Sequence, residues 1–244
     1  MTETACQGGR DHYDVTGDGP VLLVLPGGAG HPMGLGPLVE RLTTRFTVVT
    51  YDPLGLAHGR LGLPVAEQRV ADWSEGAHRV LEAVLPEGEP AYVFGTSSGG
   101  IAVLDLLARH PGRLAHVVAH EPPCVTVLPD GAERRAELIG RLDGPGQPPA
   151  EGESATPMGV FLARVLHPFT RYAPAAVPAS VPLTLAAGAD SHGHVLYRTA
   201  EFLAERLGGA FTEFPGGHLG TLEHPVEFAD RLAESLLSGA RSPS

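Results

Sequence analysis

Short apolar runs alternate with amphipathic segments along most of the chain. Six runs have the length and composition of buried strands, and they span 20–27, 46–52, 91–95, 114–120, 181–188 and 210–215. The segments between them repeat apolar residues at helical spacing, at 34–45, 65–85, 98–109, 194–207 and 223–237. Continuous apolar strands separated by helices are typical of a parallel sheet that is covered on both faces. The pattern predicts an α/β fold, a three-layer α/β/α sandwich with a mainly parallel sheet.

This alternation stops between residues 122 and 180. The stretch contains the Pro-rich sequence "DGPGQPPAEGESATP" (143–157), followed by a helical pattern whose N-cap would be Thr156, with Pro157 at the first position. Apolar residues then recur at helical spacing, from Phe161 to Phe169, which favours a face that packs on apolar surface or substrate. We predict a core formed by residues 1–121 and 181–244, with 122–180 as a helical lid; a floppy insertion is the alternative.

The stretch "YVFGTSSGGIAVLDLLARHPG" (92–112) passes from a strand pattern to a helix pattern without a spacer. Its Gly95-Thr96-Ser97-Ser98-Gly99 core has the G-x-S-x-G spacing of a sharp turn, in which bulkier residues at the glycine positions would clash. Such a turn places the Ser97 hydroxyl at the carboxyl edge of the sheet and the Ser98 N–H at a helix N-terminus. Ser97 is therefore the candidate nucleophile. A phosphate-binding turn is the alternative, although a P-loop requires a lysine and this chain has none.

A nucleophilic serine needs a base, and the base needs an acid that orients it. His218 lies in "FPGGHLGTLEHP", after the last predicted strand, and Asp190 follows the preceding strand in "LTLAAGADSHG". Both loops lie at the same sheet edge as Ser97. The order along the chain, Ser97, then Asp190, then His218, is the one expected of a site with a serine, an acid and a histidine in this type of fold. Glu121, in "VVAHEPP", also ends a strand at this edge and is the alternative acid. Asp190 is preferred because its loop position is the commoner one.

These motifs resemble those of the α/β-hydrolase superfamily, in particular its small single-domain, actinobacterial-type serine hydrolases. The resemblance runs from about Val21 to Leu237 and is weakest through 122–180; "LPGGAG" (25–30) is similar to the oxyanion loop of the family. It departs from the family pattern in Pro26-Gly27, where His-Gly is frequent, and in the lack of Arg after Asp52. The resemblance implies a triad and two oxyanion-hole N–H groups, contributed by Ser97, Asp190, His218, Gly28 and Ser98.

The motifs predict a serine hydrolase that acts on an ester, thioester or lactone of a small molecule through an acyl-enzyme. One alternative is a non-hydrolytic enzyme of the same fold, a cyclase, lyase or acyltransferase of natural-product biosynthesis. Another is a ligand-binding module that uses the same pocket. His31, just after the oxyanion loop, would line that pocket or lie on the surface.

Charge and composition limit the kinds of partner that we expect this protein to bind. The net charge of -11 argues against nucleic acid or anionic lipid, and no apolar run approaches the ~18 residues that a membrane span needs. The N-terminal stretch lacks the basic start and apolar core of a secretory signal, so we expect a cytoplasmic protein. No cofactor is expected, and no metal, because His192 and His194 lack a convergent third ligand.

Overall fold

Seven strands form one sheet in the computed structural model, which describes residues 11–143 and 156–238. Their order is β1-β3-β2-β4-β5-β6-β7; β1 runs antiparallel to β3 and every other pairing is parallel. The strands are β1 (His12–Thr16), β2 (Val21–Leu25), β3 (Thr47–Asp52), β4 (Ala91–Thr96), β5 (Leu114–His120), β6 (Leu183–Gly188) and β7 (Ala210–Phe214). The predicted mainly parallel sheet is confirmed.

The hydrophobic pattern does not predict β1. This strand reads "HYDVT", and all five residues are only partly buried. It pairs along the outer edge of β3, with Tyr13 opposite Tyr51 and Val15 opposite Val49. An edge strand of alternating polar and apolar residues lacks the continuous apolar run by which the other strands are recognised.

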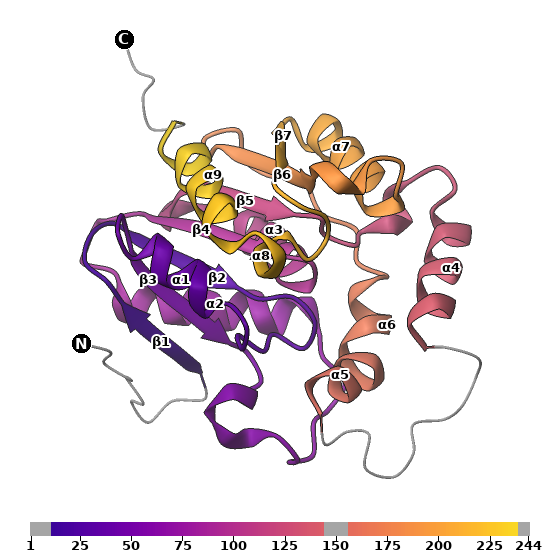
Figure 1. Ribbon diagram of the computed structural model, residues 1–244, viewed down its shortest axis with the longest axis horizontal. Coiled ribbons are helices and arrows are strands. Elements are labelled where there is room, and N and C mark those ends of the chain that lie inside the picture. Colours follow the sequence, from indigo (N-terminus) through magenta and orange to yellow (C-terminus); the bar gives the residue numbers. More distant parts are fainter. Residues whose placement is uncertain (1–10, 144–155, 239–244) are drawn as a thin grey trace.

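Helices cover both faces of the sheet (Figure 1). One face carries α2 (Val70–Val84), α3 (Ser98–Arg109) and α7 (Val195–Leu207), and the other carries α1 (Gly36–Leu42) and α9 (Pro225–Ser238). Alternate residues of one strand enter different cores: Leu23 joins the cluster on the α3 side, whereas Leu22 joins the cluster that contains Phe228 of α9. The predicted three-layer sandwich is therefore confirmed.

The segment between β5 and β6 leaves the sheet and forms helices of its own. These are α4 (Gly131–Asp143), α5 (Pro157–Val160) and α6 (Leu166–Phe169), with one π-helical turn between α5 and α6. The side chain of Thr156 accepts a hydrogen bond from the Gly159 N–H at 3.0 Å, which confirms the predicted N-cap. Most of the Pro-rich stretch 143–157 lies outside the described residues.

The end of this β5–β6 segment is anchored to the core. Phe169 packs edge-on against Trp73 of α2, with ring centroids 4.6 Å apart. The Tyr172 hydroxyl donates to the buried carboxylate of Asp105 on α3 at 2.9 Å. Asp105 also accepts hydrogen bonds from Ser74 and Arg109, so its charge is compensated inside the fold. Helices α5 and α6 are thereby held near the end of β4.

The turn between β4 and α3 has the tight geometry that G-x-S-x-G predicts. Ser97 adopts φ +53° and ψ -120°, a strained backbone conformation for a residue with a side chain. A Cβ atom at Gly95 would lie 2.4 Å from the Gly99 carbonyl oxygen, and one at Gly99 would lie 2.1 Å from the Leu25 carbonyl oxygen. Glycine is required at both positions because backbone atoms occupy the space of a side chain.

We predict that Gly99→Ala lowers the free energy of unfolding by about 3 kcal/mol, the upper end of the usual cost of overpacking, because backbone must move to admit the methyl group. Gly140→Ala is the matched control: Gly140 lies within α4 and nothing would stand within 4 Å of the added Cβ. That change should be neutral or stabilising by up to about 1 kcal/mol. Urea denaturation followed by circular dichroism measures both, and equal midpoints for the two variants would contradict the packing argument.

Candidate active site

Ser97 stands at the junction of β4 and α3, with its hydroxyl in a cavity at the carboxyl edge of the sheet. Its backbone N–H donates to the carbonyl of His120, the last residue of β5, at 2.9 Å. This bond helps to hold the left-handed φ of Ser97. Among the described residues, only one other non-glycine residue has a positive φ, and that residue is Glu121.

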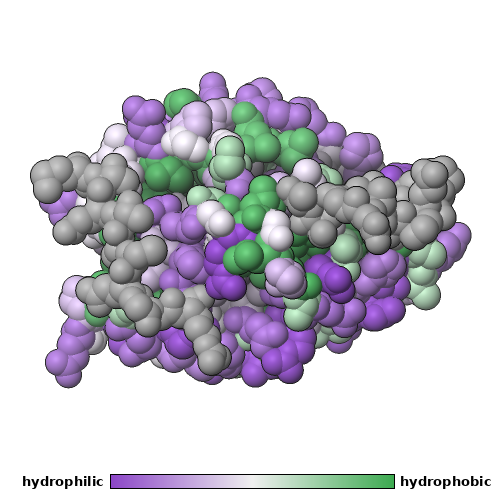
Figure 2. Space-filling view, turned by 90° about the horizontal axis from the view of Figure 1, so that it is seen from below, coloured by the Kyte–Doolittle hydropathy of each residue, from purple (hydrophilic) through white to green (hydrophobic). Residues whose placement is uncertain are grey.

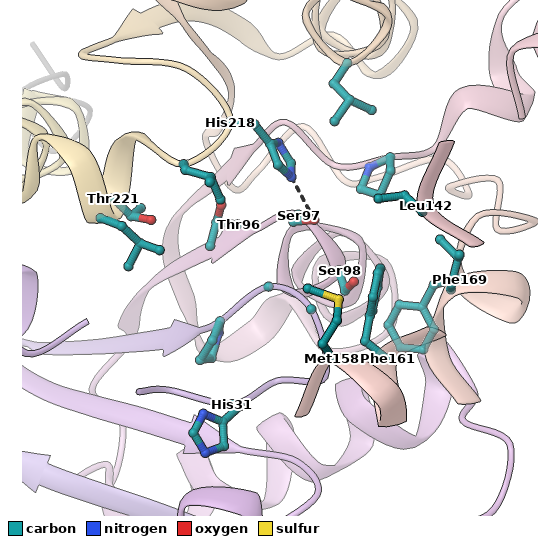
Figure 3. Close-up of a pocket in the computed structure, with 18 of the residues that line it drawn as sticks. His31, Thr96, Ser97, Ser98, Leu142, Met158, Phe161, Phe169, His218 and Thr221 are labelled. Carbon is teal, nitrogen blue, oxygen red and sulfur yellow. Dashed lines mark hydrogen bonds between the residues drawn. The ribbon is translucent and has the colours of Figure 1, made fainter. Parts of the chain in front are cut away.

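His218 connects these two strained positions. It lies in the loop between β7 and α8 (Gly220–Glu223), and its Nε2 is 3.2 Å from the Ser97 Oγ (Figure 3). Its Nδ1 is 2.8 Å from the Glu121 Oε2. An ionised carboxylate can only accept, so Nδ1 carries the proton and Nε2 offers its lone pair to the serine hydroxyl. This tautomer is the one that lets an imidazole take the serine proton.

Glu121 follows β5 directly and is 1% exposed. Its Oε1 accepts the Gly188 N–H at 2.9 Å, and the Ser191 hydroxyl also donates to the carboxylate. Burial alone would raise the pKa of Glu121, but the hydrogen bonds from His218, Ser191 and Gly188 and the nearby His120 lower it to about 2. The carboxylate is therefore ionised at neutral pH and places a fixed negative charge beside the imidazole.

The structure corrects the prediction for the acid. Asp190 lies on a 3₁₀ turn after β6, and its exposed carboxylate makes no hydrogen bond with His218 or with any other described residue. Its N–H donates to the Gly216 carbonyl at 2.9 Å, and the turn directs the next residue, Ser191, toward Glu121. The loop after β6 thus supplies donors to the Glu121 carboxylate, and Glu121, the alternative candidate, is the carboxylate that contacts His218.

The two predicted oxyanion-hole residues lie at the same cavity as Ser97 and His218. Gly28 has φ +62°, and a Cβ on the adjacent Gly27 would lie 2.9 Å from that of Ser97, so this loop packs directly against the nucleophile turn. Ser98 is the first residue of α3, where a backbone N–H has no acceptor within the helix. Both residues therefore have backbone donors close to the serine.

The cavity has a volume of about 320 Å³ and is lined mainly by apolar side chains. Its walls come from the loop after β2, from α4 to α6, from the start of α7 and from the loop after β7. His31 lines it, which was one of the two expectations for this residue. Figure 3 shows Met158, Phe161 and Phe169 together on one side of the cavity, apart from His218.

His120 lies just beneath this arrangement, fully buried, with its ring centroid 6.5 Å from that of His218. Burial lowers its pKa to about 4; the Glu121 carboxylate opposes this lowering, and His218 adds a smaller lowering of its own. Its Nδ1 is 3.2 Å from the Thr96 Oγ1. His120 is neutral near pH 7, so it adds no positive charge that would compete with His218 for Glu121.

The described residues contain no group of three His, Cys, Asp or Glu side chains that could hold a metal ion. His192, one of the two histidines beside Asp190, instead pairs with Glu213 at 2.6 Å. In the same part of the chain, no helix has the length and apolar character needed to cross a membrane.

Comparison with known proteins relates the chain to hydrolases, although no protein-family model matches it. The "uncharacterized hydrolase YraK" of Bacillus subtilis (strain 168) is 32% identical, over 94% of this chain and 93% of its own. The carboxylesterase CesB of Bacillus subtilis superposes with a TM-score of 0.60 at 20% identity, covering 98% of this chain and 92% of its own. The enol-lactonase of Burkholderia xenovorans LB400 gives 0.59 at 17% identity, covering 93% and 96%.

The lowered pKa of Glu121 predicts a pH-dependent contribution to stability. A carboxylate whose pKa is depressed in the folded state stabilises above its unfolded pKa, and this contribution is lost as pH falls toward the folded value. The pKa of Glu121 falls from 4.5, its ordinary value, to about 2 in the folded protein. This difference contributes about 3 kcal/mol to the free energy of unfolding at pH 6 and about half of that at pH 3.

Glu121→Gln should therefore destabilise the protein most near pH 6 and progressively less toward pH 3, measured by urea unfolding at several pH values. Asp190→Asn is the control and should show only a small difference at any pH, since its carboxylate is exposed. A destabilisation by Glu121→Gln that does not change with pH would contradict the electrostatic explanation.

Proposed function

Because this chain belongs to the α/β-hydrolase superfamily, we propose that it is a serine hydrolase that cleaves an ester, thioester or lactone of a small molecule. One observation carries the proposal: the imidazole of His218 bridges the Ser97 hydroxyl and the buried Glu121 carboxylate, at 3.2 and 2.8 Å. The names of the compared proteins, a hydrolase, a carboxylesterase and an enol-lactonase, support this class of bond.

In the first half of the reaction, the Ser97 Oγ attacks the acyl carbonyl carbon while His218 Nε2 takes the hydroxyl proton. Glu121 stabilises the imidazolium that forms, and it holds the ring in the required tautomer. The N–H groups of Gly28 and Ser98 would donate to the developing oxyanion, where the loss of one donor typically costs ~10²–10³ in rate. His218 then gives its proton to the leaving oxygen or sulfur, and the acyl-enzyme remains.

In the second half, water takes the place of the leaving group beside His218. Nε2 removes a proton from this water as its oxygen attacks the acyl carbon, through the same oxyanion site. The bond to the Ser97 Oγ breaks, His218 returns the proton to this oxygen, and the free acid leaves. For a lactone the leaving hydroxyl stays attached to the acyl group, and the product is a hydroxy acid.

Residues 122–180 would serve as the lid of this site. Side chains from α5 and α6 line the cavity, while Phe169 and Tyr172 tie this end of the segment to α2 and α3. An apolar lid excludes bulk water, which strengthens the electrostatic interactions within the site.

We predict that a fluorophosphonate probe labels Ser97, since it reacts with an activated serine. Ser97→Ala should abolish both labelling and ester hydrolysis, with a loss on the order of 10⁶ in kcat, the scale of triad knockouts. Ser98→Ala is the matched control from the same motif: it removes a hydroxyl but keeps the backbone N–H, so Ser97 should still be labelled. Intact-mass and peptide mass spectrometry read out both variants. Turnover that survives Ser97→Ala but is lost in His218→Ala would contradict an acyl-enzyme.

The acid is tested by a second pair of variants. Glu121→Gln should lower kcat by about 10³–10⁴, as expected when the partner of the imidazole no longer fixes its tautomer. Asp190→Asn should change kcat by less than about threefold, because its exposed carboxylate makes no hydrogen bond with His218. Steady-state kinetics on one activated ester compares the two. The reverse order of effects would assign the acid to Asp190.

A further inference from the structure

Five large apolar side chains are exposed at the mouth of the cavity that contains Ser97. Their exposed fractions run from 41% to 74%, and they are Met33, Leu142, Met158, Leu219 and Leu222. Only three other large apolar side chains are exposed in the described part of the chain, and none of them lines this cavity: Leu61, Leu63 and Val226. We refer to the five residues as the apolar rim.

The rim is assembled from separate parts of the chain. Met33 comes from the loop before α1, Leu142 from α4, Met158 from α5, and Leu219 and Leu222 from the loop after β7 and from α8. One amphipathic helix that packs incompletely could expose several apolar residues by itself. The rim residues lie on separate elements, so incomplete packing of one helix does not explain their exposure. Hydrophobic surface gathers at the centre of the face seen in Figure 2, the side on which α5 lies in Figure 1. Apolar patches of this kind mark binding sites on a soluble surface.

The interior of the cavity is lined mainly by apolar side chains, like the rim. Phe161, Leu166 and Phe169 line it, and no Asp, Glu or Arg does. The hydroxyl of Thr170, which also faces the cavity, already donates to the Leu166 carbonyl at 2.7 Å. The ionisable side chains in the lining are His31 and His218, so a charged group on a substrate would find no carboxylate or guanidinium partner in this cavity, and its burial there would be costly.

Charged residues collect instead in a neighbouring cavity of about 600 Å³. The two cavities share Leu138, Leu196, His218 and Leu219 in their linings, but Ser97 lines only the apolar one. The charged residues of the second cavity, besides Glu121, are Arg134, Glu137, Arg141, Asp190, Arg198 and Glu223. Carboxylates and guanidinium groups are thus close to the site, but they do not line the cavity in which acyl transfer would occur.

We infer that the substrate carries an uncharged, apolar acyl group that fills the inner cavity against Phe161 and Phe169 and continues across the apolar rim. This inference rests on the proposed serine-hydrolase function and specifies its substrate class. A volume of about 320 Å³ holds about ten groups of the size of a water molecule. After the ester group itself is placed, an acyl chain of roughly six to eight carbons fills the remaining space, and the rim covers what protrudes.

Chain-length dependence of p-nitrophenyl ester hydrolysis tests the inference. From acetate through butyrate and hexanoate to octanoate, kcat/KM should rise about fourfold per methylene until the cavity is full. Mono-p-nitrophenyl glutarate, close in length to the hexanoate but ending in a carboxylate, should be at least about 100-fold poorer than the hexanoate. A flat profile, or equal rates for the charged and uncharged esters, would overturn the inference.

Rim variants separate this specificity from general hydrophobicity. Met33→Ser combined with Met158→Ser should lower the octanoate-to-acetate ratio of kcat/KM about tenfold, because the longer acyl chain loses apolar contacts. Leu63→Ser is the matched control, since Leu63 is 52% exposed but lies outside the cavity, and it should leave the ratio unchanged. An equal fall in the ratio for both variants would count against the rim.

Labelling distinguishes a failure of this inference from a failure of the proposed function. Fluorophosphonates with ethyl and octyl chains report directly on Ser97, even if p-nitrophenyl esters turn over slowly. Faster labelling by the octyl probe, reduced in the rim variant, supports the inference. Labelling of Ser97 at equal rates by both probes would leave the serine hydrolase intact and overturn the substrate class. No labelling by either probe would overturn both.

Discussion

The buried carboxylate of Glu121 is the feature on which the site depends. A charge that is 1% exposed would be strongly destabilising without partners, and here it has three hydrogen-bond donors. Gly188 and Ser191 donate from the loop after β6, and His218 donates from the loop after β7. One carboxylate therefore fixes both loops against the end of β5, and the same interactions that stabilise its charge orient the imidazole.

Backbone geometry brings this carboxylate and the nucleophile together. Ser97 and Glu121 end adjacent parallel strands, and both take a left-handed φ that side chains rarely adopt. Hydrogen bonds between the strand ends hold each of them: the Ser97 N–H donates to the His120 carbonyl, and the Glu121 N–H donates to Ala186 at 2.9 Å. Within residues 11–143 and 156–238, a positive φ at a non-glycine residue occurs only at these two positions, which turn a side chain toward His218, and the sheet supports both.

Local patterns explain what could be predicted from the sequence. The buried strands have continuous apolar runs, the glycines beside Ser97 mark a turn that only glycine permits, and His218 lies in a loop after the last strand. The choice of acid depends on something else. Asp190 and Glu121 both follow strands at the same sheet edge. The backbone turn at each position decides which carboxylate faces His218, and this turn cannot be predicted from the type of residue. Contacts between segments far apart in the sequence, such as that between Tyr172 and Asp105, also cannot be predicted from a local sequence pattern.

A crystal structure of the protein after reaction with a diethyl phosphate ester inhibitor would test the central claim most directly. The account predicts phosphorus bonded to the Ser97 Oγ, a phosphoryl oxygen within hydrogen-bond distance of the Gly28 and Ser98 N–H groups, and His218 Nδ1 still on Glu121. An adduct in which His218 has turned to Asp190, or a fully reacted protein with phosphorus on a residue other than Ser97, would contradict it.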